Sequence, residues 1–262
     1  MIDLHSHIIS EAQKVLVDEH NVDWESVLNI ARMALEDGID HIVWTPEYSA
    51  SQINDSDVSR NEFLLNALNQ KLLEAGFPIT LSLSADFHLD LRENVLKVED
   101  IERAQNSRYV LLSFSQVYLP THFESIIRNL LDNGYVPVIA HPERLGWINE
   151  KYHVIRSLID DGAWIQITAD SFTGYFGRKA QYWAERFLSE GIIHVIASEA
   201  NSADRRPPVL SEAKQFLASN LSREEVKMIT EVRPQLMVSN EICPLELLPP
   251  GVNYGWQTEK VS

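Results

Sequence analysis

Met1-Ile-Asp-Leu-His-Ser-His7 opens the chain and sets the interpretation of everything that follows. We predict a strand over residues 2–4 that runs directly into His5 and His7. In extended backbone, side chains two residues apart point to the same side, so both imidazoles can reach one metal ion. A His-x-His pair alone is weak evidence. Its position adds weight, because parallel-barrel enzymes place their active-site residues where strands end.

Strand and helix patterns alternate along the rest of the chain. Apolar runs predict six further strands, over residues 41–44, 79–85, 109–114, 136–140, 164–168 and 193–197. Apolar residues at helical spacing, mostly followed by glycine, predict helices over residues 24–35, 61–75, 123–133, 153–161 and 177–190. About seven strands alternating with helices predict a parallel α/β architecture. Because no linker interrupts the order, we expect one domain over residues 1–242 and an irregular tail over residues 243–262.

Composition excludes several classes of protein. The 262 residues are 45% hydrophobic, which is enough for a large core, and the formal net charge is −16. Without a basic cluster larger than pairs such as Arg205-Arg206, general binding to nucleic acid is not expected, whereas a small anionic substrate is compatible with this charge. Cys243 is the single cysteine, which suits a reducing cytoplasm. No apolar run has the length of a membrane span and no basic leader precedes one, so we expect a cytoplasmic protein without membrane insertion.

Candidate metal ligands recur where the predicted strands end. Taken alone, a histidine or acid after a strand is more often a helix cap or a solvated loop residue. In a barrel of parallel strands, however, these ends converge on one rim. Nitrogen and carboxylate ligands together suit a divalent transition metal such as Mn, Fe or Zn. The predicted ligands are His5, His7, Glu47, Asp86, His141 and Glu199. His88, two residues past Asp86, is left outside this set.

Two arginines lie just beyond two of these strand ends, at Arg144 and Arg206. A guanidinium group binds phosphate oxygens through two parallel hydrogen bonds. A surface salt bridge explains either arginine alone about as well. Beside a rim of metal ligands, the phosphate interpretation is preferred.

Four stretches, taken together and in order, carry a resemblance to a known family. They are residues 1–7, Ile139-Ala-His-Pro-Glu-Arg144, Gln166-Ile-Thr168 with Ser171-Phe-Thr-Gly174, and Ile196-Ala-Ser-Glu-Ala-Asn201 with Arg206-Pro-Pro208. Across residues 1–242 the chain resembles the capsule-type bacterial protein-tyrosine phosphatases of the polymerase and histidinol phosphatase (PHP) superfamily. The resemblance implies a distorted seven-stranded α/β barrel, a cluster of commonly three metal ions, and hydrolysis of phosphotyrosine on a tyrosine autokinase. That kinase controls export of capsular polysaccharide or exopolysaccharide.

The chain departs from that family at five places. The family's Asp-Asp-Gly run, Thr-Pro-His motif, two glutamates and Ser-Asp-x-His motif are replaced by Ser10-Glu-Ala-Gln13, Thr45-Pro-Glu47, Asp86, Ser113 and Ser198-Glu-Ala-Asn201. By resemblance, one metal position keeps four ligands, in His5, His7, Asp86 and Glu199. A second keeps Asp86 and His141 but lacks an acid at Ser113. The third would rest on Glu11, Glu47 and Asn201 and is largely dismantled. We therefore expect one well-occupied ion, manganese by preference, and at most a weak second.

Two functions of different class stay open. In the first, the resemblance implies a metal-dependent tyrosine phosphatase with a metal-bound hydroxide as nucleophile and Arg144 and Arg206 stabilising the phosphoryl charge. In the second, the protein is a pseudophosphatase that binds or regulates a phosphoprotein. A PHP hydrolase of a small phosphate ester is a less favoured third. Cysteine-based chemistry is not expected, because Pro249 stands where a Cys-x5-Arg loop beginning at Cys243 needs its arginine. The enzyme interpretation is preferred.

Overall fold

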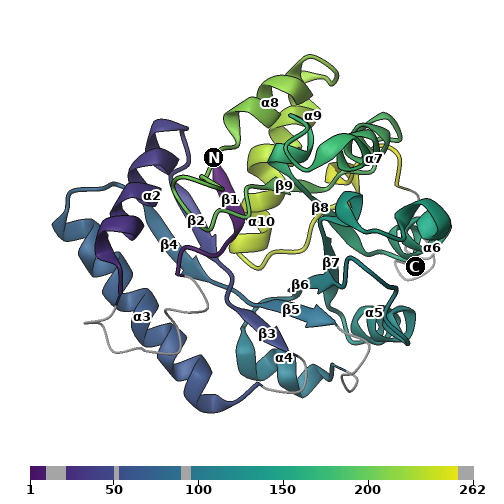
Figure 1. Cartoon of the computed structure of the whole chain (residues 1–262). Helices are drawn as coiled ribbons and strands as arrows, with labels where there is room; N and C mark the ends of the chain where they lie inside the picture. The colour runs from purple at the N-terminus through teal and green to yellow at the C-terminus, as the bar shows by residue number, and fades with distance from the viewer. Residues whose placement is uncertain (10–21, 50–52, 90–95, 253–262) are drawn as a thin grey trace.

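The computed structural model describes residues 1–9, 22–49, 53–89 and 96–252, and in it strands and helices alternate (Figure 1). The strands are β1 (Ile2–Ser6), β2 (His41–Trp44), β3 (Glu47–Ser49), β4 (Thr80–Leu83), β5 (Asp86–Leu89), β6 (Tyr109–Phe114), β7 (Val136–Ala140), β8 (Trp164–Thr168) and β9 (Val195–Ala197). The α-helices are α2 (Trp24–Glu36), α3 (Asp55–Glu74), α4 (Val98–Ala104), α5 (Phe123–Asp132), α6 (Ile148–Asp160), α7 (Gly177–Ser189), α8 (Ser211–Ala218), α9 (Arg223–Lys227) and α10 (Arg233–Val238).

All paired strands are parallel, as the alternation predicts. They form two sheets rather than one closed sheet in the described part of the chain. One has the order β1-β2-β4, and the other has the order β3-β5-β6-β7-β8-β9. Most helices lie around the outside of the strands in Figure 1, whereas α10 lies near the middle of the view beside β1, where Met237 and Val238 pack against the inner faces of the strands. The parallel α/β class is therefore confirmed, while the described residues contain nine strands instead of about seven.

Two short breaks account for the additional strands. Thr45-Pro46 separates β2 from β3, and Ser84-Ala85 separates β4 from β5. Proline lacks the N–H that a strand ladder needs, which explains the first break. Hydrogen bonding continues across both breaks, because the N–H of Ser84 donates to the Trp44 carbonyl and that of Asp86 to the Pro46 carbonyl, each at 3.0 Å. The chain thus passes from the small sheet into the large one without losing its direction.

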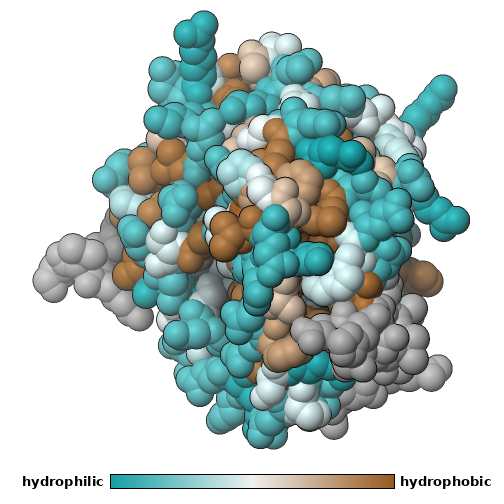
Figure 2. Space-filling view, turned by 90° about the vertical axis from the view of Figure 1, so that its left-hand side faces the viewer, coloured by the Kyte–Doolittle hydropathy of each residue, from teal (hydrophilic) through white to brown (hydrophobic). Residues whose placement is uncertain are grey.

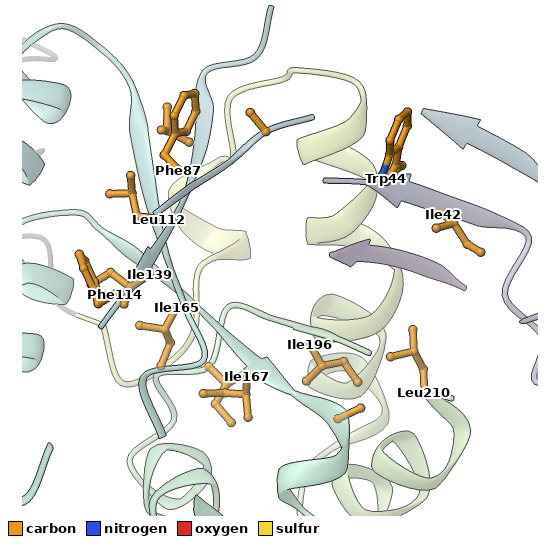
Figure 3. Packing of buried hydrophobic residues seen from close by; sticks show 14 of the residues in the cluster. Ile42, Trp44, Phe87, Leu112, Phe114, Ile139, Ile165, Ile167, Ile196 and Leu210 are labelled. Carbon is orange, nitrogen blue, oxygen red and sulfur yellow. The ribbon is translucent and has the colours of Figure 1, made fainter. Parts of the chain in front are cut away.

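Most strands, including β1, β6, β8 and β9, are buried on both faces, which explains their nearly continuous apolar sequences. Side chains that face the helices make one large core, and Figure 3 shows Phe87, Leu112, Ile139 and Ile165 from four neighbouring strands within it. Side chains on the opposite face make a second cluster between the sheets, which includes Leu4, Val43, Leu111, Val138 and Val195. Strands fixed from both sides give a rigid base for the residues that follow them.

Helix starts differ from the prediction where the first turn is polar. The Asp23 side chain accepts a hydrogen bond from the N–H of Ser26 at 3.1 Å and caps α2 as expected. By contrast, α3 begins at Asp55, six residues before its predicted start at 61. Asn54 caps it by accepting from the N–H of Asp57 at 2.9 Å. Polar residues in the first turn of α3 hide the apolar spacing on which the prediction relied.

The outer surface is mixed in character. Figure 2 shows hydrophilic residues over most of one face, around hydrophobic residues nearer its centre. Among the described residues, no helix combines the length and the apolar content that crossing a membrane requires.

The core packing predicts a large difference between two leucines of α3. Leu68 is fully buried, whereas Leu73 is 78% exposed on the same helix. Leu68→Ala should lower the free energy of unfolding by about 2–5 kcal/mol, because it leaves a cavity. Leu73→Ala should change it by less than about 0.5 kcal/mol. Urea denaturation followed by circular dichroism measures both, and equal losses would contradict the packing described here.

Candidate functional site

A cavity of about 690 Å³ lies where the parallel strands end. Its lining residues come from the C-terminal ends of β1, β6, β7 and β9 or just beyond them, and from β3 and β5 just after the breaks that follow β2 and β4. Every residue predicted for the metal rim or the arginine pair lines this one cavity, namely His5, His7, Glu47, Asp86, His141, Arg144, Glu199 and Arg206. The convergence expected from the strand ends is therefore observed.

Three of these side chains form a compact group. His5 and His7 approach each other through their Nε2 atoms at 3.0 Å, and His5 Nε2 lies 3.5 Å from Asp86 Oδ2. In the described part of the chain, His5, His7 and Asp86 each offer a ligand atom, all within 4.8 Å of one another. Two imidazole nitrogens and one carboxylate oxygen at this separation could hold a divalent transition metal.

Outer hydrogen bonds fix the orientation of this group. His5 Nδ1 lies 3.0 Å from Gln166 Oε1, and because an amide oxygen only accepts, Nδ1 carries the proton. When the ring is neutral, its lone pair is therefore on Nε2, the nitrogen that approaches His7 and Asp86. Ser113 donates to Asp86 Oδ1 at 2.6 Å, so Oδ2 is the Asp86 oxygen nearer His5. Metal ligands in proteins are typically oriented by second contacts of this kind. The donor set and its supports therefore fit a cation.

Electrostatics in the group also favour positive charge. Burial opposes a charge on His5, but the carboxylates of Asp86 and Glu199 outweigh it and raise the pKa of His5 to about 9. Burial likewise opposes ionisation of Asp86, yet the neighbouring His5 and His7 hold the pKa of Asp86 below its usual value. Since metal binding displaces protons from its ligands, a cation could replace the proton on His5.

His141 lies beside the group in a left-handed backbone conformation, with φ of 38°. It begins the short 3-10 helix Pro142–Arg144, which also carries Arg144 into the cavity. Glu143 fastens this turn to the end of β8, because its Oε1 accepts from the Thr168 N–H at 3.0 Å and the Ser171 hydroxyl at 2.7 Å. Burial and nearby Arg144 lower the pKa of His141 to about 4, although Glu199 opposes the shift. The neutral imidazole can therefore act as a metal ligand.

The carboxylate of Glu199 lies with the arginines. Its Oε2 accepts from Arg144 Nη1 at 2.5 Å and from Arg206 Nη1 at 3.2 Å. Its Oε1 accepts from the Thr168 hydroxyl at 2.6 Å. Burial alone would raise the pKa of Glu199, but His141, Arg144 and His5 hold it well below its usual value. Both guanidinium groups also pack against Phe176, at 4.2 Å and 5.4 Å from the ring centre.

The remaining ligand predictions fall at the edge of the cavity or outside the described residues. Glu47 and Asn201 are exposed and line the cavity. Glu11 lies outside the residues that the structure describes. His88, which the prediction omitted, lines the cavity and pairs in register with Ser113. Its position two residues past Asp86 in β5 was the available signal, because alternate residues of a strand face the same side.

The polar residues of β8 were also missed as site residues. Gln166 supports His5, and Thr168 contacts Glu199. Both stand inside the otherwise apolar run of residues 164–168, and both are buried. A buried polar residue in an apolar strand needs a partner, which is the signal that could have identified them.

Sequence comparison identifies the class of protein. The chain matches the family described as capsular polysaccharide synthesis, CpsB/CapC, over residues 1–239, and it belongs to that family. It is 27% identical over 243 residues to the tyrosine-protein phosphatase YwqE of Bacillus subtilis, covering 92% of each chain. It is 26% identical over 249 residues to the tyrosine-protein phosphatase CpsB of Streptococcus pneumoniae, and the match covers 92% of this chain and 100% of the other.

Solved structures agree with this on the fold. The chain superimposes with a TM-score of 0.80 on a structure from work on YwqE of Bacillus subtilis and CpsB of Streptococcus pneumoniae, described as unique metal-dependent tyrosine phosphatases. The identity is 23%, and the alignment covers 97% of this chain and 98% of the other. A probable 2-pyrone-4,6-dicarboxylic acid hydrolase of Acinetobacter baumannii gives a TM-score of 0.55 at 14% identity, over 91% of this chain and 98% of that one. These likenesses support the fold.

The three-residue group predicts which histidine controls metal content. In protein purified without chelators and dialysed against Mn²⁺, His5→Ala should weaken metal affinity by at least about 100-fold, because losing only an outer support of a ligand costs 10- to 100-fold. His153→Ala removes an exposed histidine of α6 and should leave metal content unchanged. Elemental analysis gives the ions per chain, and equal metal in the two variants would exclude the group as the metal site.

Proposed function

We propose that this protein is a metal-dependent phosphatase that hydrolyses phosphotyrosine on a bacterial tyrosine autokinase of capsular polysaccharide or exopolysaccharide synthesis. One observation carries the proposal: a single cavity combines the nitrogen and carboxylate group of His5, His7 and Asp86 with the arginine pair Arg144 and Arg206. Membership of the CpsB/CapC family and relatives named as tyrosine-protein phosphatases support it. Such a kinase substrate would place the protein in the cytoplasm.

In this proposal His5, His7 and Asp86 hold one divalent ion, manganese by preference, with Fe or Zn as alternatives. A bound ion supplies Lewis acidity and lowers the pKa of water there. Gln166 and Ser113 keep the donor atoms oriented. Asp86 and His141 would make a weaker second position, and Glu47 and Glu199 remain predicted ligands.

The proposed role of Arg144 and Arg206 is to bind and orient the phosphoryl group. Both guanidinium groups border the cavity and share one acceptor atom, so they can converge on one anion. Packing against Phe176 restricts their rotation. Groups fixed in this way need little rearrangement as phosphoryl charge develops, which is how such contacts speed a reaction.

A second candidate function is a pseudophosphatase that binds or regulates a phosphoprotein. Ser113 supports this alternative, because it stands where the family resemblance implies a carboxylate ligand and it uses its hydroxyl on Asp86. The arginine pair would still bind a phosphoryl group without turnover. A hydrolase of a small phosphate ester is less favoured, because the matched family is the capsular one.

We further propose that the two sheets together act as one distorted seven-stranded barrel of PHP type. In that description β2 with β3, and β4 with β5, each count as one strand. The N–H of Glu199 donates to the His5 carbonyl at 2.9 Å, which supports contact between the first and last strands. The domain would span residues 1–242, with residues 243–262 as its tail. Within the described part of that tail, the N–H of Gly251 donates a hydrogen bond to the Gly191 carbonyl at 2.9 Å.

Turnover should depend both on the group of His5, His7 and Asp86 and on the arginine pair. In the presence of Mn²⁺ we expect the protein to hydrolyse a phosphotyrosine peptide, and a chelator should abolish this activity. Arg144→Ala should lower kcat/KM by about 100-fold or more, the usual effect of removing one group that stabilises developing charge. Arg178→Ala, which removes an exposed arginine of α7, is the matched control and should change little. Equal rates in the two variants would remove Arg144 from the proposed site.

Rebuilding the missing ligands separates the two candidate functions. Ser113→Glu, Glu47→His and Asn201→His together restore the ligand types that the resemblance implies, and a second ion can stabilise both the attacking and the leaving oxygen. We expect a gain of at least about tenfold in kcat, which corresponds to 1.36 kcal/mol. A silent parent with an active rebuilt variant would identify a pseudophosphatase. If both are silent while the rebuilt variant binds its metals, the proposed substrate is wrong.

A further inference from the structure

Glu199 occupies the arginine pair that the proposed function assigns to phosphate. Both guanidinium groups bind the same carboxylate oxygen, and the Thr168 hydroxyl binds the other. We propose that Glu199 is a built-in competitor of the phosphoryl group and determines how tightly this site binds phosphate. The inference rests on the proposed function, because it takes the arginine pair as the phosphate site.

The contacts of Glu199 are those that a phosphoryl group would use. The two carboxylate oxygens of Glu199 accept three hydrogen bonds. Arg144 and Arg206 donate at 2.5 Å and 3.2 Å, and the Thr168 hydroxyl donates at 2.6 Å. Charge-assisted hydrogen bonds of this kind are strong, and the arginine pair holds them with Phe176 behind it. With Glu199 in place, two positive charges are offset by one negative charge. An incoming phosphate therefore meets a weaker field than the arginines alone would give.

Burial makes this pairing harder to displace. Glu199 is only 3% exposed, and the side chains of Arg144 and Arg206 are 12% and 23% exposed. Water screens such a pair poorly, so the attraction exceeds that of a surface salt bridge. A phosphate must displace the carboxylate before it can take both guanidinium groups.

Side-chain length and backbone position together bring Glu199 onto the arginines. The residue follows the last strand, β9, and has a φ of 54°, which is uncommon for a residue other than glycine. Its backbone is fixed because its N–H donates to the His5 carbonyl at 2.9 Å. Glutamate reaches one methylene farther than aspartate, so Glu199→Asp should draw the carboxylate back from the arginine pair.

The test is the binding of inorganic phosphate to metal-free full-length protein, measured by isothermal titration calorimetry. Working without metal separates the arginine pair from any role of Glu199 toward a cation. Glu199→Gln keeps the shape but removes the charge, and should tighten phosphate binding by at least about tenfold, the factor that 1.4 kcal/mol represents. Glu199→Asp should give a smaller gain. Circular dichroism and thermal melting verify that both variants fold.

Asp170→Asn is the matched control for the loss of one negative charge. The Asp170 carboxylate interacts electrostatically with Arg206, but the two make no ion pair in the described part of the chain. This variant should bind phosphate as the parent does. A gain equal to that of Glu199→Gln would reduce the effect to net charge and overturn the proposal.

Arginine variants distinguish failure of this inference from failure of the proposed function. Adding Arg144→Ala to Glu199→Gln should abolish the gain. If Arg144→Ala weakens phosphate binding but Glu199→Gln does not tighten it, the competitor role is wrong and the arginine site stands. If neither Arg144→Ala nor Arg206→Ala alters phosphate binding, the arginine pair fails as the phosphate site and both ideas fall. Undetectable binding in Glu199→Gln also overturns the competitor role.

Discussion

The site depends on a buried carboxylate that joins the first strand to the end of the last. Asp3 in β1 accepts hydrogen bonds from the N–H of Ser198, at 2.9 Å, and from the Ser198 hydroxyl. Burial raises the pKa of Asp3 to about 6, and the Ser198 contacts limit that rise. Backbone hydrogen bonds join the same two segments, because the N–H of His7 donates to the Ala200 carbonyl at 2.7 Å and that of Glu199 to the His5 carbonyl at 2.9 Å. Together these contacts hold the two histidines beside the segment that carries Glu199 and Arg206.

The sequence predicted the parts of the fold that local chemistry determines. Apolar runs such as residues 136–140 coincide with observed strands, because strands covered on both faces require continuous apolar sequence. β5 was missed for the opposite reason. Asp86 and His88 face the cavity while Phe87 lies in the core, so the segment alternates in polarity and does not form an apolar run. The polar side chains of the site thus interrupt the apolar pattern from which β5 would have been predicted.

For the candidate site, the sequence predicted where the residues lie better than it predicted which of them contact one another. The rule that parallel strands end on one rim brought all eight candidate residues to one cavity. It could not say which atoms meet there. Glu199 was assigned to a metal by its position after a strand, yet its nearest partners are Arg144, Arg206 and Thr168. Such partners depend on distances of a few tenths of an ångström between segments far apart in sequence.

Ser113 links the number of ions to the geometry of the cavity. Its hydroxyl donates to one oxygen of Asp86, so that oxygen has one fewer lone pair for a cation. A carboxylate often bridges two ions by giving one oxygen to each, and the hydrogen bond from Ser113 competes with that arrangement. The other Asp86 oxygen, Oδ2, lies 3.5 Å from His5 Nε2 and belongs to the group formed with His5 and His7. The same serine that the proposal counts as a missing ligand therefore also limits the neighbouring carboxylate, which supports the proposal of one ion held by His5, His7 and Asp86.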